Sequence, residues 1–351
     1  MKINTSFLEP CLSILRRHGP TPSATALAAA DASASALRAA TSGQELVHPP
    51  LDFGLVFADR HAEDLLRMSD DELWELRRSC ARFGLLCFRG MAGMTAERFG
   101  QFMGRWGAIE RDYDVLADGS LDPTAPADVA PAVFGNGGPG EHLYADPSWH
   151  FDGEDLAHLH SFTSLFCLRP PHVGHSTAFA ATSVAAAHLP AELLARLDGA
   201  QAEYSSLDIG NVEVLHDDNG PQLKPILRQH KHFHDELPPA LQLYGGRKRI
   251  ILSDGTVLPE ADALVLGDAL AEYATQPAFQ CALEWEEDSL AIWDNQTCQH
   301  AVVPYDYTSQ TRKMWRMTIG EDEPPLPPAV LAAVTDGGGG GGSASNSKAR
   351  L

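Results

Sequence analysis

A succession of short apolar segments separated by turn residues constrains the fold of this chain more than any other feature. The segments have the length and composition of β-strands, and one helical stretch at about 259–275 interrupts them. Many short strands with turn signals between them favour a β-barrel or a double-sheet jelly roll. The sequence therefore predicts a mainly β fold with flanking helices. The expected strands cover residues 162–168, 176–180, 223–228, 248–252, 281–285, 289–293 and 313–319.

Two helices are predicted on the N-terminal side of these strands. Ser69 followed by Glu72 forms a capping box, which marks the start of the first helix. Thr95 caps the second helix, whose large apolar residues recur at helical spacing and are assigned to the core. These apolar residues are Phe99, Phe102, Met103 and Trp106. A short apolar strand, 85–88, lies between the two helices.

The two ends of the chain differ in composition from the part between them. Residues 1–48 are rich in Ala, Ser and Thr, which is typical of a disordered leader or of an organelle transit segment. Residues 322–351 are rich in Pro and Gly and are predicted to form a flexible tail. One domain is therefore expected over residues 49–321. The last three residues, Ala349-Arg350-Leu351, are similar to a peroxisomal signal, so an organelle is the alternative to the predicted cytoplasmic location.

The formal net charge of −21 limits the partners that this protein can have. So acidic a surface repels phosphate backbones and anionic membranes, and we expect neither a nucleic acid nor a membrane as a partner. An anionic small molecule would need a local cluster of basic side chains. The six cysteines form no Cys-x-x-Cys pair and several lie in apolar runs, so they are interpreted as buried hydrophobic residues of a protein in a reducing compartment.

Two clusters far apart in the chain hold residues that bind metals. His150 and Asp152 are two positions apart, so on a strand both side chains would point to the same face. Taken alone, this pair is also compatible with a polar surface site. His300 follows the apolar run 290–293. Two histidines and one carboxylate can occupy one face of an octahedral metal, which is the ligand set of non-haem Fe(II) oxygenases.

Two arginines follow the second histidine. Arg312 and Arg316 have i, i+4 spacing, so on a strand they would also share one face. A guanidinium group binds a carboxylate with two parallel hydrogen bonds, which suits a dicarboxylate co-substrate. Salt bridges to Asp306 or Glu321 are the alternative interpretation of the pair.

Taken together, these residues resemble the taurine dioxygenase (TauD/TfdA-like) family of Fe(II)/2-oxoglutarate-dependent oxygenases over roughly residues 52–321. The motifs that carry the resemblance are His150-x-Asp152, Thr177, Trp293-Asp294-Asn295, His300 and the pair Arg312 and Arg316. The resemblance implies a double-stranded β-helix (cupin-like jelly roll) and an oxidoreductase that uses Fe(2+), 2-oxoglutarate and O2. It also implies a homodimer or homotetramer.

The resemblance further implies a reaction and a set of iron ligands. His150, Asp152 and His300 would hold the iron, and 2-oxoglutarate would be decarboxylated to succinate while a small anionic substrate is hydroxylated or desaturated. Related halogenases replace the carboxylate ligand with a small residue, so Asp152 argues against halogenation.

Four further positions carry over from the family. Arg312 would pair with the distal carboxylate of 2-oxoglutarate, and Thr177 would donate a hydrogen bond to the same end. Arg316 matches a position near the co-substrate or an anionic substrate. Asn136, in the loop before the iron-binding segment, would line the substrate pocket.

Other interpretations remain open at this point. An oxidase of amino-acid-derived isonitriles is an alternative within the same superfamily. A zinc-type hydrolase or lyase could use the same three ligands, although it has no use for the arginine pair. A non-catalytic relative is also possible, although all three ligands are present. His230-Lys-His232-Phe-His234 could bind a second metal, but a solvated strand end is the favoured interpretation.

Overall fold

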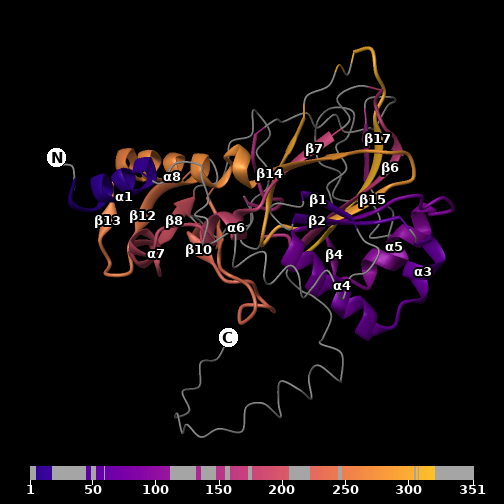
Figure 1. Cartoon of the computed structure of the whole chain (residues 1–351), viewed down its shortest axis with the longest axis horizontal. Helices are drawn as coiled ribbons and strands as arrows, with labels where there is room; N and C mark the ends of the chain where they lie inside the picture. The colour runs from indigo at the N-terminus through magenta and orange to yellow at the C-terminus, as the bar shows by residue number, and fades with distance from the viewer. Residues whose placement is uncertain are drawn as a thin grey trace, which may run out of the picture.

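A computed structural model describes most of the chain between residues 5 and 320 (Figure 1). The described residues are 5–17, 45–48, 53–58, 60–110, 132–135, 148–154, 159–172, 176–204, 222–243, 247–303, 306 and 308–320. Over these ranges, none of the helices has the length and apolar character needed to cross a membrane.

The largest sheet has eight strands and forms one wall of the fold. Its order is β1-β2-β3-β15-β6-β17-β4, and β5 also pairs with β17. Neighbouring strands are antiparallel except β2 and β3, which are parallel. The strands are β1 (Glu45–His48), β2 (Phe53–Phe57), β3 (Leu85–Phe88), β4 (Ile109–Glu110), β5 (Ala132–Gly135), β6 (Phe162–Arg169), β15 (Leu290–Asp294) and β17 (Lys313–Ile319).

A three-stranded sheet, β14-β7-β16, packs against the inner face of the largest sheet. Its strands are β7 (Ser176–Ala180), β14 (Gln280–Glu284) and β16 (Gln299–Val302). Phe179 and Leu283 from this small sheet share one buried cluster with Leu165, Trp293 and Met314 from the large one. Two sheets closed around a common apolar interior form a jelly roll, so the predicted fold class is confirmed.

Helices cover the outer face of the largest sheet. They are α3 (Ala62–Arg67), α4 (Asp70–Phe83) and α5 (Ala96–Gly104). Because side chains alternate along a strand, Phe162, Phe166 and Ile292 point away from the interior and pack against the apolar faces of these helices. The predicted helix starts are confirmed, since Ser69 forms a capping box with Glu72 and the Thr95 hydroxyl accepts a hydrogen bond from the Arg98 N–H.

A long insert between β7 and β14 builds a second layer. The expected strands 223–228 and 248–252 and the expected helix 259–275 lie in this insert, but the sequence did not predict that they belong to a separate sheet. It contains a four-stranded sheet, β13-β12-β8-β9, and a short pair, β10-β11. The helix α8 packs on β12, and the insert encloses its own buried cluster. The elements are α6 (Thr182–Ala187), α7 (Ala191–Leu197), β8 (Gln201–Tyr204), β9 (Gln222–Pro225), β10 (Leu227–Arg228), β11 (Ala240–Leu241), β12 (Arg247–Ile251), β13 (Val257–Leu258), α8 (Glu260–Ala274) and the 3-10 helix η2 (Pro277–Phe279).

The N-terminal stretch predicted as a leader contains a helix, α1 (Thr5–Arg17), and the strand β1. Figure 1 shows α1 lying along α8 at the insert, far from the strands of the jelly roll. Cys11 and Ile14 of α1 are buried in the cluster of the insert, so an apolar partner surface accounts for this helix. Residues 18–44 of the predicted leader and the predicted tail 322–351 lie outside the described residues.

Candidate metal centre

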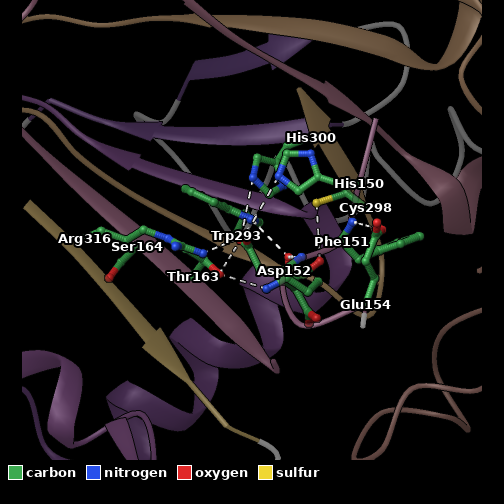
Figure 2. A network of polar contacts seen from close by, with 12 residues as sticks. His150, Phe151, Asp152, Glu154, Thr163, Ser164, Trp293, Cys298, His300 and Arg316 are labelled. Carbon is green, nitrogen blue, oxygen red and sulfur yellow. Dashed lines mark hydrogen bonds and ion pairs between the residues drawn. The ribbon is translucent and has the colours of Figure 1, made fainter. Parts of the chain in front are cut away.

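The backbone brings His150 and His300 together. The two residues form an isolated antiparallel bridge in which each N–H donates to the carbonyl oxygen of the other, at 3.1 and 3.0 Å. His300 lies on β16, whereas His150 lies in the segment that precedes β6. The two imidazole centroids are consequently 4.2 Å apart, and both side chains are buried (Figure 2).

Asp152 completes the cluster from the turn that follows His150. Its Oδ1 lies 4.0 Å from His150 Nε2, and its Oδ2 lies 3.6 Å from His300 Nε2. The three donor atoms lie within 4.8 Å of one another, and this is the one such cluster in the described part of the chain. The predicted ligand set is therefore assembled in space, although its histidines are 150 residues apart in the sequence.

The Asp152 carboxylate is ionised despite its burial. Desolvation is the largest single influence and would raise the pKa of this carboxyl. The Arg316 guanidinium, the two imidazoles and the Thr163 hydroxyl together outweigh it and hold the pKa well below its usual range. Arg316 donates a hydrogen bond of 2.7 Å to Oδ1, and the Thr163 hydroxyl donates one of 2.7 Å to Oδ2. An ionised, oriented carboxylate is what a divalent metal needs.

Both imidazoles are also prepared for a metal. His150 Nδ1 donates to the Ser148 carbonyl oxygen at 2.9 Å, which leaves the lone pair of Nε2 directed at Asp152. Burial lowers the pKa of His300 to about 3, so its imidazole is neutral at physiological pH. Two imidazole nitrogens and one carboxylate match the donor set of a facial Fe(II) site. The residues present fit the metal.

Asn295 connects the two halves of the site, a role that was not predicted for it. Its side-chain oxygen accepts hydrogen bonds from the Asp152 N–H and from Trp293 Nε1, both at 3.2 Å. Its side-chain nitrogen donates to the Thr163 hydroxyl at 3.0 Å, and that hydroxyl in turn donates to Asp152. Thr163 was also missed, and its signal in the sequence is a threonine near the start of the mainly apolar strand β6.

The turn after Asp152 depends on glycine. Gly153 has a φ of +74°, and a Cβ at this position would lie 2.8 Å from the backbone nitrogen of His160. His160 N donates to the Asp152 carbonyl oxygen at 3.2 Å, so the two strand ends approach closely here. Only glycine combines this backbone conformation with so close a neighbour.

The other predicted site residues are placed less directly. Thr177 is buried on β7, and its hydroxyl accepts a hydrogen bond of 2.9 Å from Trp285 Nε1. Arg312 precedes β17, and a register shift between Lys313 and Met314 separates it from Arg316. Strand alternation therefore does not establish that Arg312 and Arg316 share one face of the sheet. Arg312 lies near enough to Cys167 on β6 for its positive charge to lower the pKa of that thiol, against the larger opposite effect of burial. Asn136 lies outside the described residues.

One interpretation of the histidine-rich segment is wrong. His230 is not at a solvated strand end: it is buried, and its Nε2 lies 2.9 Å from Asp294 Oδ2. The apolar residues that follow explain this, because Phe233 packs against Trp74 of α4 and holds the segment against the body of the fold. His234 alone fits the expectation, since its side chain is exposed.

A jelly roll that encloses two histidines and a carboxylate, backed by an arginine, defines a class of metal-dependent oxygenases. A model of the taurine catabolism dioxygenase TauD, TfdA family matches residues 49–318. The chain belongs to this family.

Two characterised relatives align over most of their length. The (S)-phenoxypropionate/alpha-ketoglutarate-dioxygenase of Sphingobium herbicidovorans is 28% identical over 295 residues, which are 78% of this chain and 94% of the relative. The alpha-ketoglutarate-dependent 2,4-dichlorophenoxyacetate dioxygenase of Cupriavidus pinatubonensis is 26% identical over 280 residues, which are 73% of this chain and 91% of the relative.

Solved structures share the fold. A taurine dioxygenase from Burkholderia xenovorans has a TM-score of 0.59 at 21% identity and covers 78% of this chain and 90% of its own. The protein AAD-2, in complex with Mn(II) and N-oxalylglycine, has a TM-score of 0.59 at 19% identity and covers 81% of this chain and 99% of its own. With the family shown, the protein is an Fe(II)- and 2-oxoglutarate-dependent dioxygenase that uses O2.

Proposed function

We propose that His150, Asp152 and His300 hold the iron of this dioxygenase and that its prime substrate is a small organic anion. The observation that carries the proposal is the buried cluster itself, in which an ionised carboxylate faces two imidazole nitrogens. When bound, iron together with 2-oxoglutarate and O2 supplies an oxidant that hydroxylates or desaturates an unactivated C–H bond, with release of succinate and carbon dioxide.

The residues of the chain prepare the site for this chemistry. Thr163 and Asn295 orient Asp152 before any metal binds, so the metal meets a fixed carboxylate. The interior of the jelly roll beside the cluster is apolar, with Phe179 and Trp293 packed against the His300 ring. This packing keeps water away from the reacting groups.

Arginines are assigned to the two anionic molecules that the reaction needs. We place Arg312 and Thr177 at the distal carboxylate of 2-oxoglutarate, because an arginine binds a carboxylate with two hydrogen bonds and a hydroxyl adds a third. Arg316 already lies beside the metal site through Asp152, which suits it to the anionic group of the co-substrate or the substrate. Both characterised relatives are named for aryloxyalkanoates, so these compounds are the first substrate candidates.

The test is an anaerobic titration of the purified protein with Fe(II) and then 2-oxoglutarate, followed by visible spectroscopy. We expect a charge-transfer band in the wild type and none in His300→Ala. Arg312→Ala should form the band only at a much higher 2-oxoglutarate concentration. His188→Ala is the matched control, since His188 lies on the insert and its Nδ1 donates to the carbonyl oxygen of Val184 in the same helix at 2.8 Å.

Substrate class is then tested by succinate release with phenoxypropionate, 2,4-dichlorophenoxyacetate and taurine. Stimulation by one of these anions supports the proposal, and stimulation only by uncharged compounds overturns its anionic part. A folded, iron-loaded wild type without the band would overturn the assignment of the site. The cytoplasmic location and the homodimer or homotetramer are proposals that rest on the sequence alone.

A further inference from the structure

His230 and Asp294 form a buried pair that takes no direct part in the metal cluster. His230 Nε2 lies 2.9 Å from Asp294 Oδ2, and the two side chains are 1% and 0% exposed. His230 Nδ1 accepts hydrogen bonds of 3.1 Å from the backbone N–H groups of His232 and Phe233. A nitrogen that accepts two N–H bonds carries no proton, so the proton of the neutral ring is on Nε2 and is donated to Asp294.

Asp294 shapes the turn that carries the ligand His300. Its Oδ1 accepts a hydrogen bond of 2.8 Å from the Gln296 N–H. Its carbonyl oxygen accepts the N–H groups of Thr297 and Cys298, both at 3.1 Å. The turn therefore closes around Asp294, and β16 with His300 begins directly after it.

The next residue along the chain is Asn295, which holds the other half of the site. A continuous path of hydrogen bonds runs from Asn295 to Thr163 at 3.0 Å and from Thr163 to the Asp152 carboxylate at 2.7 Å. A displacement of Asp294 would therefore move Asp152, by way of Asn295 and Thr163. It would also move His300, because the turn that begins at Asp294 leads into β16.

The insert supplies further contacts to the same turn. The Lys231 N–H donates to the Gln296 side-chain oxygen at 3.0 Å, and the Gln242 side chain donates to the Asn295 carbonyl oxygen at 3.4 Å. Gln299 donates to the Leu243 carbonyl oxygen at 2.9 Å. Residues 230–231 and 242–243 of the insert therefore contact this turn, and the His230 and Asp294 pair is buried between them.

We propose that His230 and Asp294 are positioning residues for the metal site, through which the insert holds Asn295 and His300 in the arrangement that binds the metal. This inference rests on the proposed function of the site. A buried carboxylate must have a hydrogen-bond donor for each oxygen, and the imidazole is the donor to Oδ2. Removal of that donor forces the carboxylate to find another partner, and the turn moves with it.

The test compares variants of this pair in the full chain by anaerobic titration with Co(II) alone. Both oxygens of Asp294 accept hydrogen bonds, so Asp294→Asn places its amide NH2 against a donor in either orientation, the His230 Nε2–H or the Gln296 N–H. The tautomer of His230 cannot change to relieve this, because Nδ1 already accepts two N–H groups. His230→Phe keeps the ring but removes the donor. Both should raise the dissociation constant of the metal about tenfold or more, as substitutions of residues that orient metal ligands do. His230→Gln keeps an N–H donor and should bind the metal almost as tightly as the wild type.

A matched control separates positioning from general stability. Glu236→Gln breaks the exposed ion pair of 2.6 Å between Arg78 of α4 and Glu236, which lies two residues after the histidine-rich segment. It makes no change in the turn at residues 294–298. Its metal affinity should equal that of the wild type. The thermal unfolding midpoint of each metal-free variant is measured alongside, because a purely structural pair would lower the midpoint without changing the metal affinity of the folded protein.

The results of these titrations either support or overturn the positioning role of His230 and Asp294. Weak metal binding in His230→Phe that His230→Gln restores supports the inference, and this comparison decides it even if Asp294→Asn does not fold. Wild-type affinity in folded His230→Phe overturns it, as does an equal loss in Glu236→Gln. A wild type that binds no metal at all instead overturns the proposed function of the site, so the two failures are distinguishable.

Discussion

Thr163 donates a hydrogen bond of 2.7 Å to Asp152, from the strand β6 at the centre of the largest sheet. This hydrogen bond connects the only carboxylate of the proposed metal cluster to an interior strand of the largest sheet. Thr163 is fully buried, and its oxygen also accepts the Asn295 side-chain N–H. One hydroxyl therefore orients the proposed ligand Asp152 and is itself oriented by Asn295, in the turn that leads to the proposed ligand His300.

Substitution of Thr163 should weaken metal binding without a large change in shape. Thr163→Val replaces the hydroxyl by a methyl group of similar size, and we expect the dissociation constant for Co(II) to rise about tenfold. Thr163→Ser retains the hydroxyl and should bind the metal like the wild type. Titration of both variants by calorimetry checks the prediction, which equal affinities for Val and Ser would contradict.

Alanine at Gly153 should harm the site more than alanine at a comparable glycine elsewhere. Gly153 and Gly255 both have positive φ, +74° and +81°, but nothing lies within 4 Å of a Cβ at Gly255. Gly255→Ala should lower the free energy of unfolding by about 1 kcal/mol from backbone strain alone. Gly153→Ala should lower it further and weaken metal binding, because the new Cβ pushes against the His160 backbone beside Asp152. Similar unfolding free energies and unchanged metal affinity in both variants would refute this.

The loss of Arg316 should destabilise the metal-free protein and be compensated by metal. Arg316→Gln leaves a buried carboxylate without its positive partner, and removal of one member of a buried ion pair lowers stability by about 3 kcal/mol. A bound divalent cation replaces that positive charge. Denaturant unfolding with and without Co(II) should therefore show a larger metal-induced stabilisation in Arg316→Gln than in the wild type. An equal loss of stability with and without Co(II) would show that the metal does not replace the charge of Arg316 and would contradict the prediction.

The cysteines should be unreactive until the protein unfolds. All six are buried free thiols, and burial raises the pKa of Cys87 to about 11 and those of Cys167 and Cys281 to about 12. Because the thiolate is the reactive form, a thiol reagent at pH 8 should label none in the native protein and all six in guanidinium chloride. Rapid labelling of the native protein would contradict this.

The same shifts predict how stability changes in alkaline solution. The unfolded thiols ionise near their usual pKa of 9.0, whereas the folded ones keep their protons to about 11 or 12. The free energy of unfolding should therefore decrease as the pH rises through this window, with denaturant unfolding at pH 8 and pH 10.5 as the measurement. Cys281→Ala should reduce this decrease relative to the wild type.

Local sequence patterns predicted many of the individual strands and helices well. The expected strands 162–168, 176–180 and 289–293 correspond to β6, β7 and β15, and the helical stretch at 259–275 corresponds to α8. These elements were predictable because alternation and capping depend on residues close in the chain. The four-stranded sheet of the insert was not, because β8 and β12 pair over a long separation that no local pattern encodes.

The sequence by itself determined the chemistry of this protein: its ligand types, its arginines and its family motifs can be read from residue identity and order. The tertiary structure alone decided how they meet. The bridge between His150 and His300, the hydrogen bonds of Thr163 and Asn295 to Asp152, and the burial of His230 against Asp294 all join segments distant in the chain. Such contacts form only when apolar surfaces from several segments pack together, since that packing removes water and leaves each buried polar group to find its partner within the protein.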